Sequence, residues 1–271
     1  MMIRYIPADP AGNLTAIVLS SVAAQDRAKI AAEMMARCPE GFEQVGFADE
    51  TSLTGDLPTL CMMGGEFCGN ATRAFACYAA KVRGRGETRL DVSVSGAREP
   101  VPVAVDLRQN RAYAQMPLPY ALEWISVNEQ KIPLVRMEGI DHALLLDAAP
   151  SPEAAERVLA AMPKQDARGV LFVQGGKMTP LVEVAATDTR VWESSCGSGT
   201  VALAWYLAQN LADGMHAFAF DEPGGRLEAR VAMRVGRAAQ IEMGGAVKLG
   251  EEAEIELKKQ KPLLDGRPER C

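Results

Sequence analysis

Apolar and polar residues alternate with a period of two in two separate blocks of the chain, which is the pattern of half-buried β-strands. Before each block lies a stretch rich in alanine and nearly free of charge, at residues 68–80 and 196–208. A helix that is apolar on almost every side is typically buried. The pattern therefore predicts two units, each with one buried helix followed by strands. The expected strands lie at residues 90–94, 101–105 and 111–116 in the first block, and at residues 217–220, 227–231 and 237–243 in the second.

The two helical stretches are copies of one another. Residues 68–80 read CGNATRAFACYAA, residues 196–208 read CGSGTVALAWYLA, and the two are identical at seven of 13 positions. They lie 128 residues apart, close to half of the 271-residue chain. A repeat of this kind indicates a duplicated structural unit. We expect an α/β (α+β) fold of two pseudo-symmetric halves, each a β-sheet or barrel wrapped around a central helix. The proline-rich segment 116–120 predicts the boundary, giving halves 1–116 and 117–271.

Glycines and capping residues predict where the helices begin and end. The two central helices begin after Cys68 and Cys196, and we expect them to run to Gly84 and Gly214, because glycine commonly terminates helices. Two further helices are expected at residues 23–37 and 152–162, the second with Ser151 as its N-cap.

Composition narrows the class of partner. The chain has 29 basic and 35 acidic residues, a net charge of −6, which argues against a nucleic-acid binder. The N-terminal residues lack the features of a signal peptide, and no apolar run approaches the roughly 18 residues of a membrane span. We therefore expect a cytoplasmic protein with neither a nucleic-acid nor a membrane partner. The six cysteines and two histidines lack the spacing of a metal site, so no metal is expected. The oligomeric state stays open, a homodimer included.

The positions of Cys68 and Cys196 indicate acid–base chemistry. Each precedes a glycine at the start of a buried helix, where unpaired N–H groups and the helix dipole favour a thiolate and can hold a carboxylate. If the halves face one another, two thiols flank one anion site. One thiolate can then remove a proton from an α-carbon while the other thiol delivers a proton to the opposite face. Such a reaction requires no cofactor, because focused N–H dipoles stabilise the carbanion-like transition state.

The motifs around these cysteines resemble those of the diaminopimelate epimerase fold family. Cys68-Gly-Asn and Cys196-Gly-Ser-Gly match its paired catalytic motifs, and Gly12-Asn13, His142 and Pro223-Gly-Gly follow in the family's order. The resemblance covers nearly the whole chain. It implies cofactor-independent racemases or epimerases of two α/β halves, with the active site in the cleft between them.

Within that family the chain resembles the histidine racemases of staphylopine-type metallophore synthesis. The sharpest parallels are residues 66–72, EFCGNAT, and residues 192–200, WESSCGSGT. The segments that hold the distal end of diaminopimelate in diaminopimelate epimerase are replaced here. The resemblance thus implies interconversion of L- and D-histidine, a small amino-acid substrate, for an opine-type metal chelator.

Alternatives remain open at this point. Diaminopimelate epimerase or a proline racemase-like enzyme would keep the fold and change the substrate. A thiol or metal-binding protein without activity is the alternative from a different class.

The chemistry assigns roles to a defined set of residues. Cys68 and Cys196 are the expected acid–base pair. Backbone N–H groups at the two helix starts are expected to hold the α-carboxylate, and Asn13, Glu43 and Glu193 are candidates for the α-ammonium or for steering thiol protonation. His142 is expected to line the site. The expected substrate-binding residues are Asn13, Glu43, Gly69, Asn70, His142, Glu193, Gly197, Ser198 and Gly199.

Overall fold

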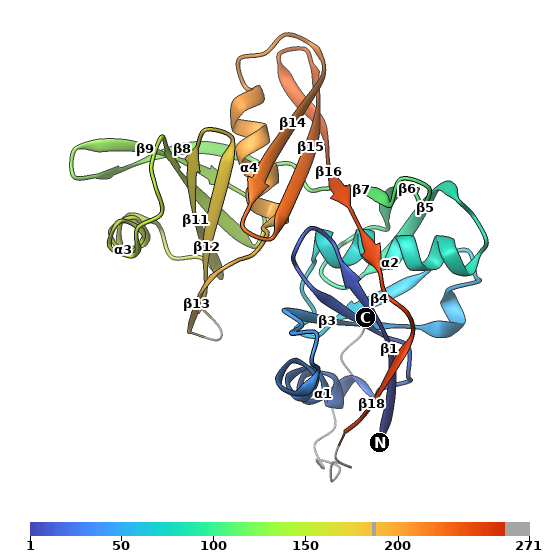
Figure 1. Cartoon of the computed structure of the whole chain (residues 1–271). Coiled ribbons are helices and arrows are strands. Elements are labelled where there is room, and N and C mark those ends of the chain that lie inside the picture. The colour runs from blue at the N-terminus through green and yellow to red at the C-terminus, as the bar shows by residue number, and fades with distance from the viewer. Residues whose placement is uncertain (186–187, 258–271) are drawn as a thin grey trace. The chain divides into compact units, whose positions relative to one another are not determined.

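The computed structural model describes residues 1–185 and 188–257 (Figure 1). The chain forms two compact units. The first, unit 1, comprises Met1–Ala114 together with residues 245–257, and the second, unit 2, comprises Gln115–Gly244. The fold is mixed α+β and dominated by sheet, as the sequence predicts. None of the helices in the described ranges is long and apolar enough to cross a membrane.

In unit 1 the strands pair in chain order, and helices make the parallel connections. β2 and β3 are parallel and are joined through α1 (Ala24–Arg37), whereas β4 and β5 are parallel and are joined through α2 (Gly69–Val82). The pairs β1–β2, β3–β4, β5–β6 and β6–β7 are antiparallel. The strands are β1 (Met2–Asp9), β2 (Thr15–Val18), β3 (Gln44–Ala48), β4 (Thr59–Met62), β5 (Glu87–Val94), β6 (Val101–Asp106) and β7 (Arg111–Gln115), with a 3₁₀ turn, η1 (Glu50–Ser52), after β3.

Unit 2 repeats this pairing scheme. β9–β10 is antiparallel, β10–β11 parallel through α3 (Pro152–Ala161), β11–β12 antiparallel, β12–β14 parallel through α4 (Gly197–Ala208), and β14–β15 antiparallel. The duplication expected from the sequence is therefore confirmed at the level of strand order and direction. The strands are β8 (Ala121–Val127), β9 (Gln130–Arg136), β10 (Ile140–Leu146), β11 (Ala167–Gln174), β12 (Lys177–Val184), β13 (Thr189–Trp192), β14 (Gly214–Glu222), β15 (Gly225–Arg234) and β16 (Arg237–Ala246).

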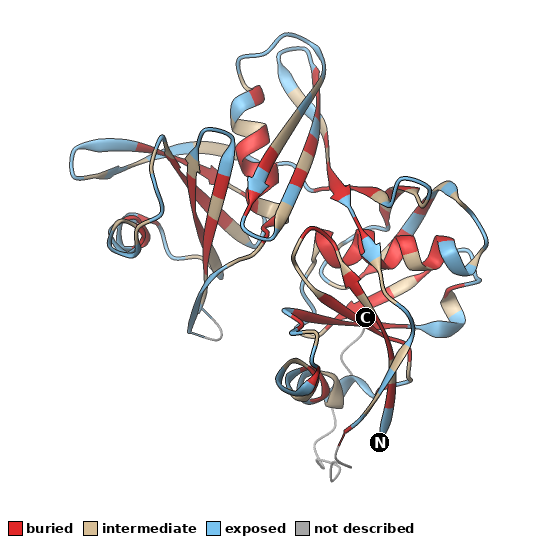
Figure 2. Cartoon of the chain, viewed as in Figure 1, coloured by how far each residue is buried: buried red, intermediate tan, exposed pale blue. Residues whose placement is uncertain are grey.

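The two alanine-rich helices are the buried ones (Figure 2). α2 packs against β2, β5 and β6 with small residues such as Ala74 and Ala76 in the core, and Phe75 fills the space among them. α4 packs against β10, β14 and β15. Small side chains let the sheet approach a helix from several sides, which explains why both copies are rich in alanine. α1 and α3 are amphipathic and bury one face only.

Two expectations about boundaries are wrong. The units do divide close to residue 116, after Ala114, but the expected second half is not one unit, because the segment after Gly244 belongs to unit 1. There β17 (Lys248–Leu249) and β18 (Ala253–Glu256) pair antiparallel with β1, and this long-range pairing leaves no local signal in the sequence. Residues 258–271 of the expected second half lie outside the described residues. α4 ends at Ala208 rather than near Gly214. At this end the side-chain amide of Gln209 donates to the Trp205 carbonyl at 2.9 Å.

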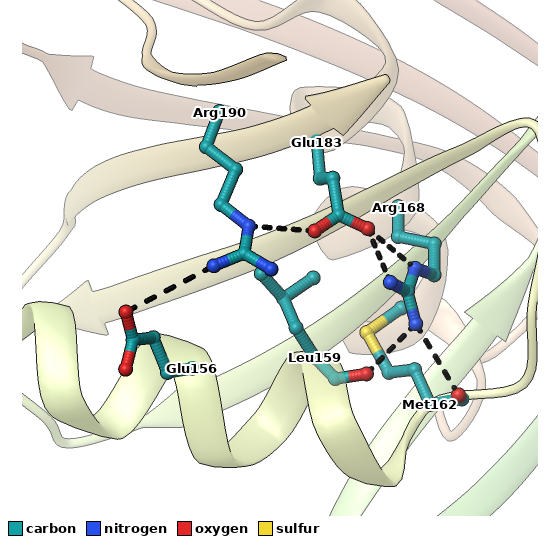
Figure 3. A network of polar contacts seen from close by, with 6 residues as sticks. All are labelled: Glu156, Leu159, Met162, Arg168, Glu183 and Arg190. Atoms are coloured by element: carbon teal, nitrogen blue, oxygen red, sulfur yellow. Dashed lines mark hydrogen bonds and ion pairs between the residues drawn. The ribbon is translucent and has the colours of Figure 1, made fainter. Parts of the chain in front are cut away.

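An ion-pair network fastens α3 to the sheet of unit 2 (Figure 3). Arg168 on β11 pairs with Glu183 on β12 and also donates to the Leu159 carbonyl at 2.8 Å, near the end of α3. Arg190 on β13 pairs with the other oxygen of Glu183 at 2.6 Å. The network therefore holds β13, the strand that leads toward Cys196.

Candidate functional site

Cys68 is the N-cap of α2. Its backbone is extended, at φ −126° and ψ 111°, and its sulfur accepts a hydrogen bond from the N–H of Ala71 at 3.5 Å. The Thr72 hydroxyl donates to the Cys68 carbonyl at 2.7 Å. The cysteine thus takes the place that serine or aspartate takes in most helix caps, and its thiol lies against the positive end of the helix.

Polar side chains from two strand ends surround Cys68 in unit 1. The Gln44 amide donates to Asn13 Oδ1 at 2.5 Å and to Thr15 Oγ1 at 2.7 Å, and it lies close enough to the Cys68 thiol to lower its pKa. Asn13 in turn donates to Glu43 Oε2 at 2.9 Å. The structure therefore brings the expected residues Asn13 and Glu43 into one network with Cys68, through a glutamine that the sequence analysis did not single out.

A buried arginine supports the same helix start. Arg73 is fully buried, and its Nε and Nη2 donate to Asn70 Oδ1 at 3.2 and 3.1 Å. Its guanidinium also donates to the carbonyls of Pro10 at 2.8 Å and Ala246 at 2.9 Å. Arg73 thus fixes the Asn70 side chain and ties the first turn of α2 to the loop that precedes Asn13.

Cys196 is the N-cap of α4 with nearly the same backbone, at φ −121° and ψ 104°. Its sulfur accepts from the N–H of Gly199 at 3.4 Å. Here a carboxylate completes the cap, because Glu222 accepts from the Cys196 N–H and from the Thr200 hydroxyl, both at 2.6 Å. Glu222 is buried, and Glu193 is a second carboxylate close enough to raise the pKa of the thiol.

A histidine and a serine stand beside Cys196. Ser198 Oγ lies 3.5 Å from Cys196 Sγ and 2.9 Å from His142 Nε2. His142 is on β10 and is 0% exposed. Burial lowers the pKa of His142 to about 3, so the imidazole is neutral near pH 7.

Burial dominates the electrostatics of both thiols. It raises the pKa of Cys68, and the N–H groups at the helix start together with the Gln44 amide oppose that rise. Burial raises the pKa of Cys196 well above its usual value, and Glu193 and Glu222 raise it further. The expected lowering of the thiol pKa by the helix start is therefore wrong for the free protein, because desolvation outweighs the dipole.

Each expected site residue falls beside one of the two cysteines. Unit 1 carries Asn13, Glu43, Cys68, Gly69 and Asn70, and unit 2 carries His142, Glu193, Cys196, Gly197, Ser198 and Gly199. In each unit the N–H groups of the first helical turn have no acceptor within the helix and can hold an anion.

Three polar contacts were missed by the sequence analysis, those of Gln44, Glu222 and the threonine that follows each cysteine by four residues. The threonine is repeated in both copies and Glu222 precedes a Pro-Gly-Gly turn, so both had a signal.

The remaining cysteines lie elsewhere. Cys38, Cys68, Cys77 and Cys196 are free thiols, whereas Cys61 on β4 is disulfide-bonded. Among the described cysteines, only Cys68 and Cys196 are both free and at a helix N-cap. No group of three or more histidine, cysteine, aspartate or glutamate side chains gathers as a metal site within the described part of the chain.

Comparison with known proteins connects this geometry to a family. The model of the family described as the histidine racemase CntK N-terminal domain matches residues 2–255. The histidine racemase of Fusobacterium nucleatum subsp. nucleatum (strain ATCC 23726 / VPI 4351) is 32% identical over 222 residues, which cover 76% of this chain and 81% of the relative. The histidine racemase of Staphylococcus aureus (strain Mu50 / ATCC 700699) is 26% identical over 239 residues, which cover 83% of this chain and 87% of the relative.

Solved structures share the fold at low sequence identity. A phenazine biosynthesis protein of the PhzF family from Enterococcus faecalis has a TM-score of 0.65 at 16% identity, with 95% of this chain and 100% of that chain covered. A probable proline racemase from Agrobacterium radiobacter K84 has a TM-score of 0.63 at 14% identity, with 94% and 93% covered. At these identities the likeness concerns the fold alone.

Proposed function

The chain belongs to the histidine racemase CntK family and is an isomerase, and from this premise we propose that it interconverts L- and D-histidine without a cofactor. Cys68 and Cys196 act as the two acid–base groups, one on each face of the α-carbon. We further propose that the two units are the halves of a diaminopimelate epimerase-like arrangement and that both cysteines act on one bound substrate.

One observation carries this proposal. Two free cysteines occupy the same N-cap position on the two buried helices of two units with the same strand pairing. A buried structural cysteine has no reason to recur as a cap, because serine, threonine, asparagine and aspartate cap helices better. A thiol that accepts helix N–H groups is, in contrast, suited to carry a proton to and from carbon.

The proposed step moves one proton in and one proton out. The thiolate of one cysteine takes the α-proton of L-histidine, and the electron pair of the C–H bond passes into the carboxylate of the substrate. The S–H of the other cysteine then delivers its proton to the opposite face and becomes the thiolate. The product is D-histidine, and the protonation states of the two cysteines are exchanged. The reverse reaction uses the same groups in opposite roles.

The helix starts supply the stabilisation that this step requires. The α-C–H bond is a very weak acid, so the charge that develops on the carboxylate must be met by oriented donors. N–H groups of Gly69, Asn70, Gly197 and Ser198 are placed in the first turns of α2 and α4 and are the proposed donors, whereas the Gly199 N–H, also expected from the sequence, donates to Cys196 Sγ. Asn13, Glu43 and Glu193 are the proposed partners of the α-ammonium group.

The proposed product suggests a use. D-histidine would supply the synthesis of an opine-type metallophore, as the sequence resemblance implies. Diaminopimelate and proline derivatives are the alternative substrates, because neighbours of the same fold include a probable proline racemase.

Proton NMR in D₂O tests the function directly. The reduced protein is incubated without added cofactor with L-histidine, other L-amino acids, diaminopimelate isomers and proline derivatives. We expect the α-proton signal of histidine to disappear and D-histidine to appear on chiral chromatography. Exchange with another amino acid only would keep the mechanism and overturn the substrate. Exchange with none would overturn the proposed function.

A further inference from the structure

Ser198 connects His142 to the Cys196 thiol. The imidazole Nε2 lies 2.9 Å from Ser198 Oγ, and that oxygen lies 3.5 Å from Cys196 Sγ. All three belong to unit 2, where His142 is supplied by β10 and the other two by the start of α4. The direction of the two hydrogen bonds decides what this chain of contacts does to the thiol.

The surroundings of Nδ1 decide the tautomer. This atom is buried and has no hydrogen-bond partner among the described residues. It faces Gly169 of β11, where an added Cβ would lie 2.1 Å away. A buried N–H without an acceptor is rarer in proteins than a buried acceptor without a donor. The neutral imidazole therefore carries its one proton on Nε2 and leaves Nδ1 as a bare lone pair.

The hydroxyl hydrogen of Ser198 is then available to the thiol. A hydroxyl has a single hydrogen, and the Ser198 oxygen already accepts from Nε2–H, so that hydrogen is free to point at Cys196 Sγ. We propose that His142 is a positioning residue: its Nε2–H orients Ser198 so that the Ser198 hydroxyl donates to Cys196 Sγ and stabilises the thiolate.

This donation opposes the other charges around Cys196. Glu222 on β14 holds the Cys196 N–H, and Glu193 after β13 reaches the thiol, so two carboxylates disfavour a thiolate there. The N–H of Gly199 is the other donor to the sulfur. The Cys196 thiol must ionise in one direction of the proposed reaction. A hydroxyl that donates to its sulfur stabilises the thiolate and so offsets the effect of the two carboxylates. The role of this donation in catalysis rests on the proposed function, whereas the donation itself can be tested without it.

Unit 1 has no counterpart of this arrangement. Asn70 stands where unit 2 has Ser198, and Arg73 holds its side chain. The chain has two histidines. The other one, His216, contacts the carbonyl of Ala212, which lies beyond the C-terminal end of α4. Cys68 is therefore an internal control for any change made at Ser198 or His142.

The tautomer can be read by ¹⁵N NMR. Protein labelled with ¹⁵N-histidine gives signals from His142 and His216 only, and His216→Gln assigns them. We expect His142 to be neutral with its proton on Nε2 at pH 7. Gly169→Ala, whose new methyl group displaces the ring, should change the His142 signals and leave those of His216 in place. A proton on Nδ1, or an imidazolium at pH 7, would overturn the proposal.

The effect on the thiol can be read by alkylation. Iodoacetamide is used at several pH values, and mass spectrometry resolves the rate at each cysteine. We expect Ser198→Ala to slow alkylation of Cys196 about tenfold at pH 7, the loss of one hydrogen bond to a charged group, and to move its pH profile upward. His142→Leu should do the same, whereas His142→Gln, whose amide N–H can replace Nε2–H, should restore much of the rate. Ser198→Ala is a small change at an accessible helix start, so it keeps the test valid if a His142 variant fails to fold.

The outcomes separate this inference from the proposed function. If Ser198→Ala slows Cys196 and spares Cys68, the inference stands whether or not any amino acid exchanges its α-proton. An unchanged Cys196 profile, a Cys196 that does not react in the unmodified protein, or an equal change at Cys68 would overturn the inference even in an active racemase.

Discussion

Cys68 and Cys196 cap their helices with the same backbone and sit in different electrostatic surroundings. Their φ and ψ angles differ by only a few degrees, and each sulfur accepts the N–H three residues ahead. Around Cys68 the neighbours are backbone N–H groups, the Gln44 amide and one carboxylate, Glu66. Around Cys196 they are two carboxylates, a hydroxyl and a buried imidazole.

This difference separates what the duplication preserved from what it left free. The helix cap and the threonine four residues after the cysteine recur in both units, so both thiols accept a hydrogen bond from the first turn of a helix. The surrounding charges do not recur, so the two thiols are chemically unequal. Burial raises the pKa of both thiols, and two carboxylates, Glu193 and Glu222, raise that of Cys196 further.

Removing either thiol should have the largest effect. Cys68→Ser and Cys196→Ser are each expected to slow racemisation by at least about a thousandfold, because each face of the α-carbon needs its own acid–base group. Each single variant should still exchange the α-proton of one enantiomer, and the two variants should favour opposite enantiomers. Chiral chromatography and deuterium exchange measure the two effects. Undiminished racemisation in both variants would contradict the two-base mechanism and would remove the functional meaning of the difference between the two cysteines.

Acid should destabilise the protein through the buried His142 of unit 2. A histidine whose pKa is about 3 in the folded state and about 6.5 in the unfolded chain binds its proton more weakly when folded. The contribution of the neutral His142 to the free energy of unfolding is therefore fully present above about pH 6.5. It is lost as the pH falls toward 3, by up to about 3 kcal/mol at pH 4. Thermal unfolding from pH 7.5 to 4 measures this for the unmodified protein and His142→Gln. We expect the variant to lose less stability in acid, and parallel curves would contradict a neutral buried His142.

Glu222 is the buried carboxylate that accepts from the Cys196 N–H. Glu222→Gln keeps an acceptor but removes the charge, so it should lower the pKa of Cys196 and speed its alkylation at neutral pH by about tenfold. Glu222→Ala leaves a buried N–H and a hydroxyl without their acceptor and should cost about 2 kcal/mol of unfolding free energy. Asp221→Asn, a neighbouring exposed carboxylate, is the control and should change neither quantity. A faster Cys68 in Glu222→Gln would show that the two sites are not independent.

The ion pairs beside β13 should have the smallest effect. Arg190 is half exposed, and Arg190→Gln is expected to leave the melting temperature within about 1 °C and the Cys196 alkylation rate unchanged. Arg168→Ala, which also loses the carbonyl contacts at the end of α3, should lower the melting temperature by a few degrees. A changed Cys196 rate in Arg190→Gln would mean that charges beyond Glu193 and Glu222 set its environment.

Much of the fold could be predicted because its signals are local. The alanine-rich copies predict α2 and α4, and the alternating segments match β5, β6 and β7 and β14, β15 and β16, with only residue 116 outside its strand. Ser151 caps α3 as expected, with its hydroxyl 3.2 Å from the Ala154 N–H. Such patterns depend on neighbours within a few residues, so the chain itself carries them.

The candidate site was predictable only in part. A repeated Cys-Gly at a helix start identified Cys68 and Cys196, and the first-turn residues follow from their position. The contacts of Gln44, Glu222 and His142 join residues far apart in the chain, so no spacing predicts these pairings, although the Pro-Gly-Gly turn after Glu222 gave a signal for that residue.

The sequence alone determined the duplication, the two helix caps and the kind of chemistry that two capping thiols can perform. The tertiary structure decided the rest. Pairing of β17 and β18 with β1 moved the end of the described chain into unit 1, and burial reversed the expected direction of both thiol pKa values. The reason is the same in both cases. Strand pairing and desolvation depend on groups brought together from distant parts of the chain, and a local pattern contains no information about which groups those are.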